Sequence, residues 1–473
     1  MLFSSIPFLY YFLPIVLIVY FLLPKIFLKN TWLLLASLFF YAWGEPKYAI
    51  LMVTAITIGY VFGLLIEKFR GKPLSKVFMI SAVALELALL IYFKYANFFV
   101  ANFAALTGMN VPTLDIILPI GISFYLFQIL SYDVDVYRGD VPAQKNYIYL
   151  ASYVALFPQL IAGPIVRYKD IEEQLISRNH SFEKIALGIR RFVIGLGKKI
   201  LIADQMSKFC FTFYQDCDDK SVLFFWVYAI ANMLCIYFDF SGYSDMAIGL
   251  GKILGFEFLE NFNYPYISKS VTEFWRRWHM SLGSWFRDYV YIPLGGNRVS
   301  KARNIFNIFV VWFLTGFWHG AAWNYIIWGV MFALLLLVEK LWTLKFLKKS
   351  KVIGHVYVLF VVLISFIFFD ATGIFENDMK ESVVAIGSLF GLGGLPLVSA
   401  ETFHYIASYA VLFIFAIVGA TPVVKNTVLK IKSTNAGEKV INVLEPLFIL
   451  GVFVIITASL VDGAFSPFLY FQF

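Results

Sequence analysis

Residues 48–66 read YAILMVTAITIGYVFGLLI and contain no charged side chain. The hydrocarbon core of a bilayer is about 30 Å thick, and roughly 20 apolar residues of helix cross it, so this stretch predicts a transmembrane helix. Similar stretches recur almost from end to end. The 473 residues are 60% hydrophobic and 14% charged, whereas an ordinary soluble domain is about 25% charged. This composition excludes a soluble enzyme, a disordered chain and a nucleic-acid-binding protein, and it predicts a single polytopic membrane domain over residues 1–473.

Several further segments are candidates for membrane spans. The clear ones are Ser5–Pro24, Tyr48–Ile66, Val77–Tyr95, Val222–Leu250, Trp323–Trp342, Val352–Asp370, Phe403–Ala420 and Ile441–Val461. Those that are short or interrupted by Gly, Pro or polar residues are Thr31–Trp43, Leu114–Ser131, Tyr147–Gly163, Ile185–Ala203, Asn304–Gly320 and Ser382–Ala400. We therefore predict an all-α polytopic membrane protein with about 11 transmembrane helices and one or two re-entrant or interfacial pieces. A β-barrel is not expected, because its strands would alternate apolar and polar residues.

Basic residues concentrate in a few connections, as the positive-inside rule expects of cytoplasmic loops. The net charge is +8, and the basic clusters are Lys25 with Lys29; Lys68, Arg70, Lys72 and Lys76; Lys345, Lys348, Lys349 and Lys351; and Lys425, Lys430, Lys432 and Lys439. With these clusters inside, both termini are expected outside the cell membrane, provided that Ser382–Ala400 does not cross. We attribute the charge to topology and to anionic membrane lipid, and not to nucleic acid. The first apolar segment lacks the features of a cleaved signal peptide, so we expect it to remain as a helix.

The densest polar stretch, residues 261–298, reads NFNYPYISKSVTEFWRRWHMSLGSWFRDYVYIPLGGNR. Ser270 or Thr272 can cap a helix that has Glu273 in its first turn. The residues that follow in this stretch are Trp275, Arg276, Arg277, Trp278 and His279. On one continuous helix Trp275 would neighbour Trp278 and His279, while the two arginines would point elsewhere. We expect an interfacial segment in which Arg reaches lipid phosphate or, equally, the pyrophosphate of a coenzyme donor.

A second stretch, residues 313–328, reads FLTGFWHGAAWNYIIW and places His319 in an apolar run beside Gly316 and Gly320. An ionisable residue within a membrane is a candidate functional residue, because burying it there is expensive. An apolar pocket favours neutral imidazole, whose free nitrogen can take a proton from a hydroxyl. Acyl transfer from a thioester to an alcohol needs such a base. The small residues would let a ligand or another chain approach closely.

Other kinds of site receive less support from the sequence. No His-Glu-x-x-His spacing occurs, so no metal site is expected, and no G-x-S-x-G elbow points to a serine nucleophile. The remaining histidines, His180, His355 and His404, lie in or beside expected loops, and we expect them to be solvated.

The stretch FDFSGYSD, residues 238–245, places Asp239 and Asp245 inside a long hydrophobic segment. They could couple an ion in a transporter or flippase, cap a broken helix, or pair with Arg276 and Arg277. We favour pairing with the arginines. Transporters commonly have repeated halves, and no repeat is visible here, which argues against a transporter.

Together these stretches resemble the membrane-bound O-acyltransferase (MBOAT) family. The resemblance rests on FWRRWHMSLGSWFRDYVYIPLGGNR and GFWHGAAWNYIIWG, with MLFSSIPFLYYFLP, LLLASLFFYAWGEPKY, FPQLIAGPIVRYKDIEEQ, YFDFSGYSDMAIGLGKILGFEFLENFNYPY and SPFLYFQF in the same order. The resemblance covers nearly the whole chain. The chain resembles most the bacterial branch of the family, which contains the alginate O-acetyltransferase membrane subunit. The family fold that it implies is a ring of helices around a central tunnel.

The resemblance also implies roles for particular residues. His319 occupies the position of the essential histidine and His279 that of the second family histidine, so both are expected to be catalytic. We expect donor-binding or tunnel-lining residues at Trp275, Arg276, Arg277, Trp278, Trp318 and Asn324. No cofactor is expected to be bound permanently.

The implied activity is an O-acyltransferase of the bacterial cell membrane. We expect an acetyl group to pass from cytoplasmic acetyl-CoA to a hydroxyl acceptor, for O-acetylation of an extracytoplasmic polysaccharide. An extracytoplasmic partner resembling SGNH hydrolases is expected, since nothing in the chain looks like a glycan-binding domain. The alternative within the family is the D-alanyl transferase of teichoic acid synthesis, which shares the WRRWH block and takes its donor from a carrier protein.

Overall fold

The computed structural model describes residues 1–44, 46–112, 114, 116–347, 349–370, 372–375 and 378–463. Every regular element in these ranges is a helix, as the sequence predicts. The chain forms two compact units: the first unit is Met1–Ile189, Ala247–Glu260 and Ser284–Pro293, and the second is Arg190–Met246, Asn261–Gly283 and the residues from Leu294 onward. Lys348 and the closing stretch SPFLYFQF lie outside the described residues.

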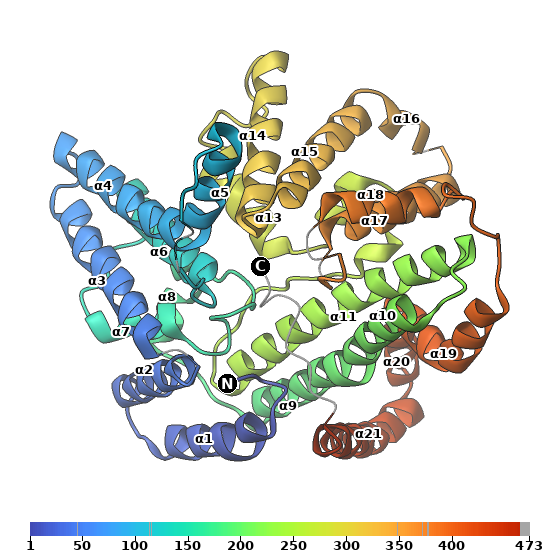
Figure 1. The fold of residues 1–473 in the computed structure, drawn as a ribbon. Coiled ribbons are helices and arrows are strands. Elements are labelled where there is room, and N and C mark those ends of the chain that lie inside the picture. Colours follow the sequence, from blue (N-terminus) through green and yellow to red (C-terminus); the bar gives the residue numbers. More distant parts are fainter. Residues whose placement is uncertain are drawn as a thin grey trace. The chain divides into compact units, whose positions relative to one another are not determined.

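The first unit contains the N-terminal helices of Figure 1. Its α-helices are α1 (Leu13–Leu22), α2 (Ile26–Ala42), α3 (Pro46–Lys68), α4 (Pro73–Leu90), α5 (Ala96–Thr107), α6 (Ile122–Arg138), α7 (Tyr147–Ala155) and α8 (Tyr168–Ile176). Its π-helical segments are η1 (Pro7–Phe12), η2 (Ile91–Tyr95) and η5 (Arg287–Tyr291). Helix α6 forms much of the core of this unit, because its residues from Ile122 to Asp133 are all buried.

The second unit contains most of the C-terminal helices. They are α10 (Asp204–Asp216), α12 (Val271–Trp275), α14 (Lys301–His319), α15 (Trp323–Val338), α16 (Leu344–Leu347), α17 (Lys351–Phe369), α18 (Met379–Ser388), α19 (Ala400–Gly419), α20 (Val423–Lys432) and α21 (Asn435–Val461). Short segments are η3 (Lys198–Ala203), η4 (Pro265–Ile267) and η6 (Glu339–Thr343). Three helices have residues in both units: α9 (Phe182–Gly197), α11 (Val222–Ile253) and α13 (Met280–Phe286).

Among the described residues, seven helices are long and apolar enough to cross a membrane. They are Pro46–Lys68, Pro73–Thr107, Val222–Ile253, Trp323–Leu347, Lys351–Phe369, Ala400–Gly419 and Asn435–Val461. Seven of the eight clear sequence candidates fall on these helices, and the eighth, Ser5–Pro24, corresponds to the shorter apolar helix Pro7–Leu22. Another short apolar helix is Ile26–Ala42. The structure therefore supports a multi-pass helical membrane protein.

Three of the interrupted candidates, Leu114–Ser131, Tyr147–Gly163 and Ser382–Ala400, contain less helix than their apolar length suggests. In Tyr147–Gly163 the helix ends at Ala155 and turns follow, and in Leu114–Ser131 it begins only at Ile122. Helix α18 ends at Ser388, before the glycine-rich residues 391–394, where the sequence indicates a break.

Close helix contact in the second unit depends on glycine. Helices α14 and α15 run side by side (Figure 1), and a Cβ atom at Gly316 would lie 2.3 Å from the Tyr325 carbonyl oxygen. A Cβ atom at Gly320 would lie 2.2 Å from the Tyr325 ring. The two glycines therefore permit close contact between two helices of this chain. This packing explains why small residues occur at these positions, and no bound ligand is needed to explain them.

Candidate functional site

The WRRWH segment is not one continuous helix. Ser270 caps α12 as expected, because its Oγ accepts a hydrogen bond from the Glu273 N–H at 3.0 Å. The helix then ends at Trp275, and the chain turns before α13 begins at Met280. His279 lies in this turn with φ of 45°, in the left-handed region that a residue other than glycine seldom adopts. The expected helical neighbourhood of Trp275 and His279 is therefore wrong.

The turn is held by the segment that precedes α12. The Asn263 N–H donates to the Arg277 carbonyl at 2.9 Å, and the Met280 N–H donates to the Asn261 carbonyl at 3.0 Å. These two bonds fix the backbone on both sides of His279. A left-handed non-glycine residue costs on the order of 1–3 kcal/mol, so such a conformation persists only where its surroundings impose it.

Glu339 holds the other end of α12, and nothing in the sequence indicated this role. Its carboxyl oxygens accept hydrogen bonds from the Val271 N–H at 2.7 Å and the Thr272 N–H at 2.8 Å, and also from the Thr272 hydroxyl. Glu339 is completely buried. The first N–H groups of a helix have no partner within it, and a carboxyl group satisfies them well. Glu339 therefore positions the short helix that leads to His279.

His279 is enclosed by an amide and two aromatic rings. Its Nδ1 lies 3.2 Å from the Asn261 Oδ1, its ring meets that of Phe240 edge-on at 4.7 Å between centroids, and Trp318 lies 6.0 Å away. The side chain is 2% exposed. It lies outside the candidate membrane spans, and its burial lowers the pKa of His279 to about 3. The imidazole is therefore neutral at ordinary pH.

His319 ends α14 within the same group of rings. Its centroid lies 5.0 Å from that of Trp318, 5.3 Å from Trp328 and 5.1 Å from Phe369. The side chain is 7% exposed. The two histidines that the sequence singles out thus both pack against Trp318, although they come from different segments of the second unit.

Trp275 belongs to the same aromatic cluster from the α12 side. Its ring lies 5.5 Å from Trp328, 4.7 Å from Trp312 and 4.8 Å from Phe332. Because Trp328 also contacts His319, a continuous chain of rings joins the end of α12 to the end of α14. Trp275, Trp318 and both histidines are therefore brought together, as expected of one site.

The remaining expected site residues have different surroundings. Arg276 is exposed, whereas Arg277 pairs with Glu273 at 2.9 Å and donates to the Asn263 carbonyl. Trp278 is buried and stacks on Phe274 at 5.6 Å between centroids, so it packs α12 against its neighbours.

Asn324 is also buried, in the first turn of α15. Its Nδ2 donates to the Phe369 carbonyl at 3.5 Å. Phe369 in turn contacts His319, so Asn324 lies next to the aromatic cluster.

The membrane carboxylates pair with partners other than the expected ones. Asp239 lies 2.6 Å from the Lys199 ammonium, and Asp245 lies 2.7 Å from Lys198 and 2.9 Å from Arg191. Pairing was expected, but with Arg276 and Arg277, and that choice of partner is wrong. The three cationic side chains come from α9 and η3. The sequence of this segment did not indicate which carboxylates they would pair with.

Two of the other histidines are not simply solvated as expected. His180 is half-buried in the first unit, and its Nε2 lies 2.9 Å from the Tyr20 hydroxyl. His355 is also half-buried, and its Nδ1 lies 3.2 Å from the Ser268 carbonyl. His404 is exposed. The described residues hold no group of three or more His, Cys, Asp and Glu side chains that could bind a metal ion.

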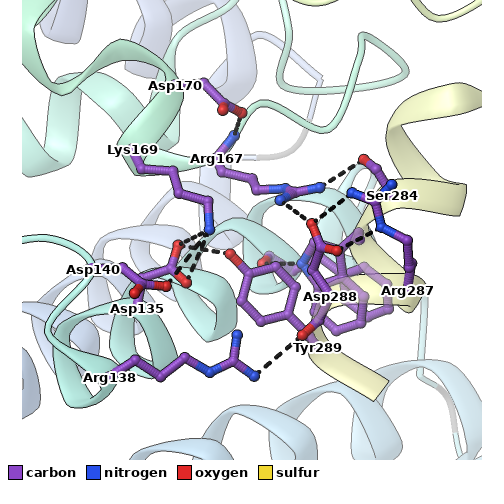
Figure 2. A network of polar contacts seen from close by, with 12 residues as sticks. Asp135, Arg138, Asp140, Arg167, Lys169, Asp170, Ser284, Arg287, Asp288 and Tyr289 are labelled. Atoms are coloured by element: carbon purple, nitrogen blue, oxygen red, sulfur yellow. Dashed lines mark hydrogen bonds and ion pairs between the residues drawn. The ribbon is translucent and has the colours of Figure 1, made fainter. Parts of the chain in front are cut away.

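The first unit contains a polar network that the sequence did not indicate. Arg167 pairs with Asp288 and donates to the Ser284 hydroxyl (Figure 2). The Arg167 side chain is 7% exposed, and its Nη1 lies 2.7 Å from the Asp288 Oδ2. The Tyr289 hydroxyl donates to Asp135 at 2.6 Å. Burial raises the pKa of Asp288, but hydrogen bonds from Arg287 and Arg167 outweigh this and lower it overall. The network fixes η5 within the first unit.

The comparisons with known proteins agree with these features. Residues 141–375, which include both site histidines, match the membrane-bound O-acyltransferase family. The chain is 38% identical to a probable alginate O-acetylase of Pseudomonas putida over the full length of both proteins. It is 33% identical to a peptidoglycan O-acetyltransferase of Helicobacter pylori, over 84% of this chain and 81% of that protein. It is 30% identical to a teichoic acid D-alanyltransferase of Bacillus subtilis, over 48% of this chain and 60% of that protein.

The regular elements of the described residues are all helices, and several of them are candidate membrane spans. Two histidines are buried among aromatic rings. These features fit a membrane enzyme that transfers acyl groups. The chain belongs to the membrane-bound O-acyltransferase family and is an O-acyltransferase. The prediction of the family from the sequence is thereby confirmed. This assignment replaces the interpretation as a transporter. Both carboxylates on which that interpretation relied are engaged in ion pairs.

Proposed function

We propose that this O-acyltransferase moves an acetyl group from cytoplasmic acetyl-CoA to a hydroxyl acceptor, for O-acetylation of an extracytoplasmic polysaccharide. The observation that carries the proposal is the packing of His279 and His319 against one ring, Trp318, in an aromatic and largely buried environment. An apolar site keeps imidazole neutral and able to accept a proton. The relatives aligned over most of their length support acetyl as the transferred group, since both are named for O-acetylation.

In the proposed reaction His319 acts as the general base. It takes the proton of the acceptor hydroxyl while the hydroxyl oxygen attacks the thioester carbonyl carbon. The carbon–sulfur bond then breaks, the coenzyme leaves as thiolate, and the proton on His319 passes to that sulfur. The products are an acetyl ester and the free thiol. General acid–base catalysis of this kind contributes roughly 10²- to 10⁴-fold to a rate.

The donor would approach beside Trp275, Arg276, Arg277 and Trp278, with Trp318 and Asn324 lining the site nearer the histidines. Exposed Arg276 is suited to bind phosphate, because a guanidinium remains charged and has several donors. Since Arg277 is already paired with Glu273, its contribution to donor binding would be smaller. No resident cofactor takes part in this scheme.

We further propose the family arrangement as a whole. One domain over residues 1–473 would form about 11 crossings around a central tunnel in a bacterial cell membrane. Both termini would lie outside, and the basic connections inside. A tunnel would let a polar thioester and its acceptor meet without either one crossing the membrane. An extracytoplasmic partner with an SGNH-hydrolase-like site would then complete transfer to the polymer.

The experiment is acyl transfer by the full-length protein in lipid vesicles, with radiolabelled acetyl-CoA as donor and an oligosaccharide as acceptor. His319→Ala should abolish transfer while the protein still folds and inserts, as a cooperative thermal transition in detergent would show. His404→Ala is the matched control, because that histidine is exposed and distant in sequence from the site. Full activity of His319→Ala would refute the assignment of the base.

The alternative donor is tested in the same vesicles. The similarity to a D-alanyltransferase over about half the chain keeps this reaction as the second candidate. A D-alanyl carrier protein replaces acetyl-CoA in a parallel assay. Transfer from the carrier protein alone would refute acetyl as the transferred group while leaving the family assignment intact.

A further inference from the structure

The hydrogen bonds around His279 determine which of its nitrogens carries the proton. Its Nδ1 faces the Asn261 Oδ1 at 3.2 Å. Its Nε2 is buried and has no hydrogen-bond partner among the described residues. In neutral imidazole one nitrogen donates and the other accepts, so the role of Nε2 follows once the role of Nδ1 is known.

The orientation of the Asn261 amide is set by its other contacts. Its Oδ1 faces the Ser281 N–H at 3.2 Å and the Ser281 hydroxyl at 2.8 Å. A backbone N–H can only donate, so the Asn261 atom that faces it must be the oxygen. The Nδ2 of Asn261 donates to the Ser244 hydroxyl at 3.1 Å, which is consistent with this orientation. Because an oxygen faces the His279 Nδ1, this nitrogen must donate.

We infer that Asn261 is a positioning residue that holds His279 as the Nδ1–H tautomer, so that its Nε2 presents a lone pair to a bound substrate O–H or N–H group. His279 then acts in the reaction as a hydrogen-bond acceptor. The inference rests on the proposed function, because it assigns the role of the second histidine in the same site. It also explains why the backbone turn at residue 279 is maintained at φ of 45°, since both the carbonyl and the side chain of Asn261 hold the residues of this turn.

Two substitutions separate positioning from general destabilisation. Asn261→Asp keeps the acceptor for Nδ1 and for the Ser281 N–H, but it adds a negative charge that stabilises protonated His279. We expect near wild-type kcat at alkaline pH and a new loss of kcat as the pH falls, because a protonated Nε2 no longer accepts a hydrogen bond. Asn261→Ala removes the acceptor and should lower kcat about tenfold or more at every pH, with a smaller change in KM.

The assay measures thiol release from acetyl-CoA by the full-length protein in vesicles, between about pH 5 and about pH 9, with an oligosaccharide acceptor. Ser244→Ala serves as the control, since it removes only the group that accepts from the Asn261 amide nitrogen; its kcat should change less than threefold. A wild-type pH profile in Asn261→Asp, together with wild-type kcat in Asn261→Ala, would overturn the inference.

The proposed function fails separately from this inference. If the wild-type protein transfers no acetyl group from acetyl-CoA, the proposed function is wrong whatever the Asn261 variants do, and if His319→Ala retains full transfer, the assignment of His319 as the base is wrong. If His319→Ala is inactive while both Asn261 variants behave as wild type, only the role of Asn261 is wrong. Thermal unfolding of each variant in detergent, in which Asn261→Asp should stay within a few degrees of wild type, distinguishes loss of function from loss of fold.

Discussion

A methyl group at Gly316 should displace His319 and reduce acyl transfer. Gly316 lies on α14 one turn before His319, where the backbones of α14 and α15 meet. An alanine Cβ would lie 2.3 Å from the Tyr325 carbonyl oxygen, 3.1 Å from the Gly329 Cα and 3.2 Å from the Gly329 nitrogen. All three are backbone atoms, so no side chain can rotate to relieve the contact.

The size of the effect follows from these distances. An ordinary carbon–oxygen contact is roughly 3.3 Å, so the helices would have to separate by about 1 Å. Overpacking of this kind typically costs about 1–3 kcal/mol. A displacement of about 1 Å at a catalytic group can lower a rate about 10²-fold. We therefore expect Gly316→Ala to unfold at a lower temperature and to retain about 1% of wild-type kcat.

The measurements are thermal unfolding in detergent and acetyl transfer from acetyl-CoA in vesicles. Gly451→Ala is the matched control, because, apart from the neighbouring residues and backbone of its own helix, no atom of the described residues lies within 4 Å of the Cβ position at this glycine. Alanine is favoured over glycine in a helix, so the control should be at least as stable as wild type and fully active. Wild-type stability and kcat in Gly316→Ala would show that α14 and α15 do not depend on this close contact.

Three further outcomes are expected. Glu339→Gln keeps one acceptor but loses charge-assisted hydrogen bonds to the start of α12, so it should lower the free energy of unfolding by about 2 kcal/mol and reduce kcat; unchanged chemical denaturation in detergent would contradict this. Burial lowers the pKa of His279 to about 3, whereas a histidine in the unfolded chain titrates at about 6.5. The folded protein should therefore lose stability as the pH falls from about 6.5 toward about 3, by up to about 1.4 kcal/mol per pH unit. His279→Gln should make that pH dependence of thermal unfolding shallower, and an equal slope in both proteins would refute the role of burial. Arg167→Ala removes the buried cation that pairs with Asp288, which keeps only the exposed Arg287, and it should destabilise the protein by about 2 kcal/mol, measured by unfolding at neutral pH. A loss below about 0.5 kcal/mol would mean that the pair is as weak as a surface salt bridge.

The helical class and the positions of most spans could be predicted, because they depend on local composition alone. Tyr48–Ile66 and its counterparts are long, apolar and uninterrupted, and such runs have few stable conformations in a bilayer other than a helix. The two histidines could be singled out, since each stands out within a motif, but their catalytic role stays a prediction. Their motifs lie 40 positions apart, so only the family resemblance assigned both to one site, and the packing of both on Trp318 agrees with that assignment.

The turn at His279 could not be predicted, because the residues that impose it are distant in sequence. The stretch TEFWRRWH has no proline or glycine and is compatible with a helix. Its helix stops at Trp275 because backbone bonds from residues 261–263 capture Arg277 and Met280. Helix propensity is a weak preference that tertiary contacts commonly override.

The partners of the membrane carboxylates were missed for a related reason. Sequence proximity to a basic cluster suggested Arg276 and Arg277, but long side chains from α9 and η3 reach Asp239 and Asp245 instead. Gly195 on α9 explains how these side chains come within reach of the carboxylates. A Cβ atom at Gly195 would lie 2.6 Å from the Gly242 carbonyl oxygen, so only a glycine permits this close approach. The two helical segments approach closely enough for Lys198 to reach Asp245. A glycine in an apolar run thus indicates close contact, but the run itself does not reveal the partner.

The charged and neutral polar groups of the second unit serve different purposes. Asp239 and Asp245 are matched by lysine and arginine, because an unpaired charge would be costly in an apolar interior. A histidine nitrogen that must accept a hydrogen bond has the opposite requirement: a carboxylate placed against the ring would stabilise its protonated form and leave it unable to accept one. His279 satisfies this requirement, since it receives a neutral amide from Asn261 and aromatic rings from Phe240 and Trp318.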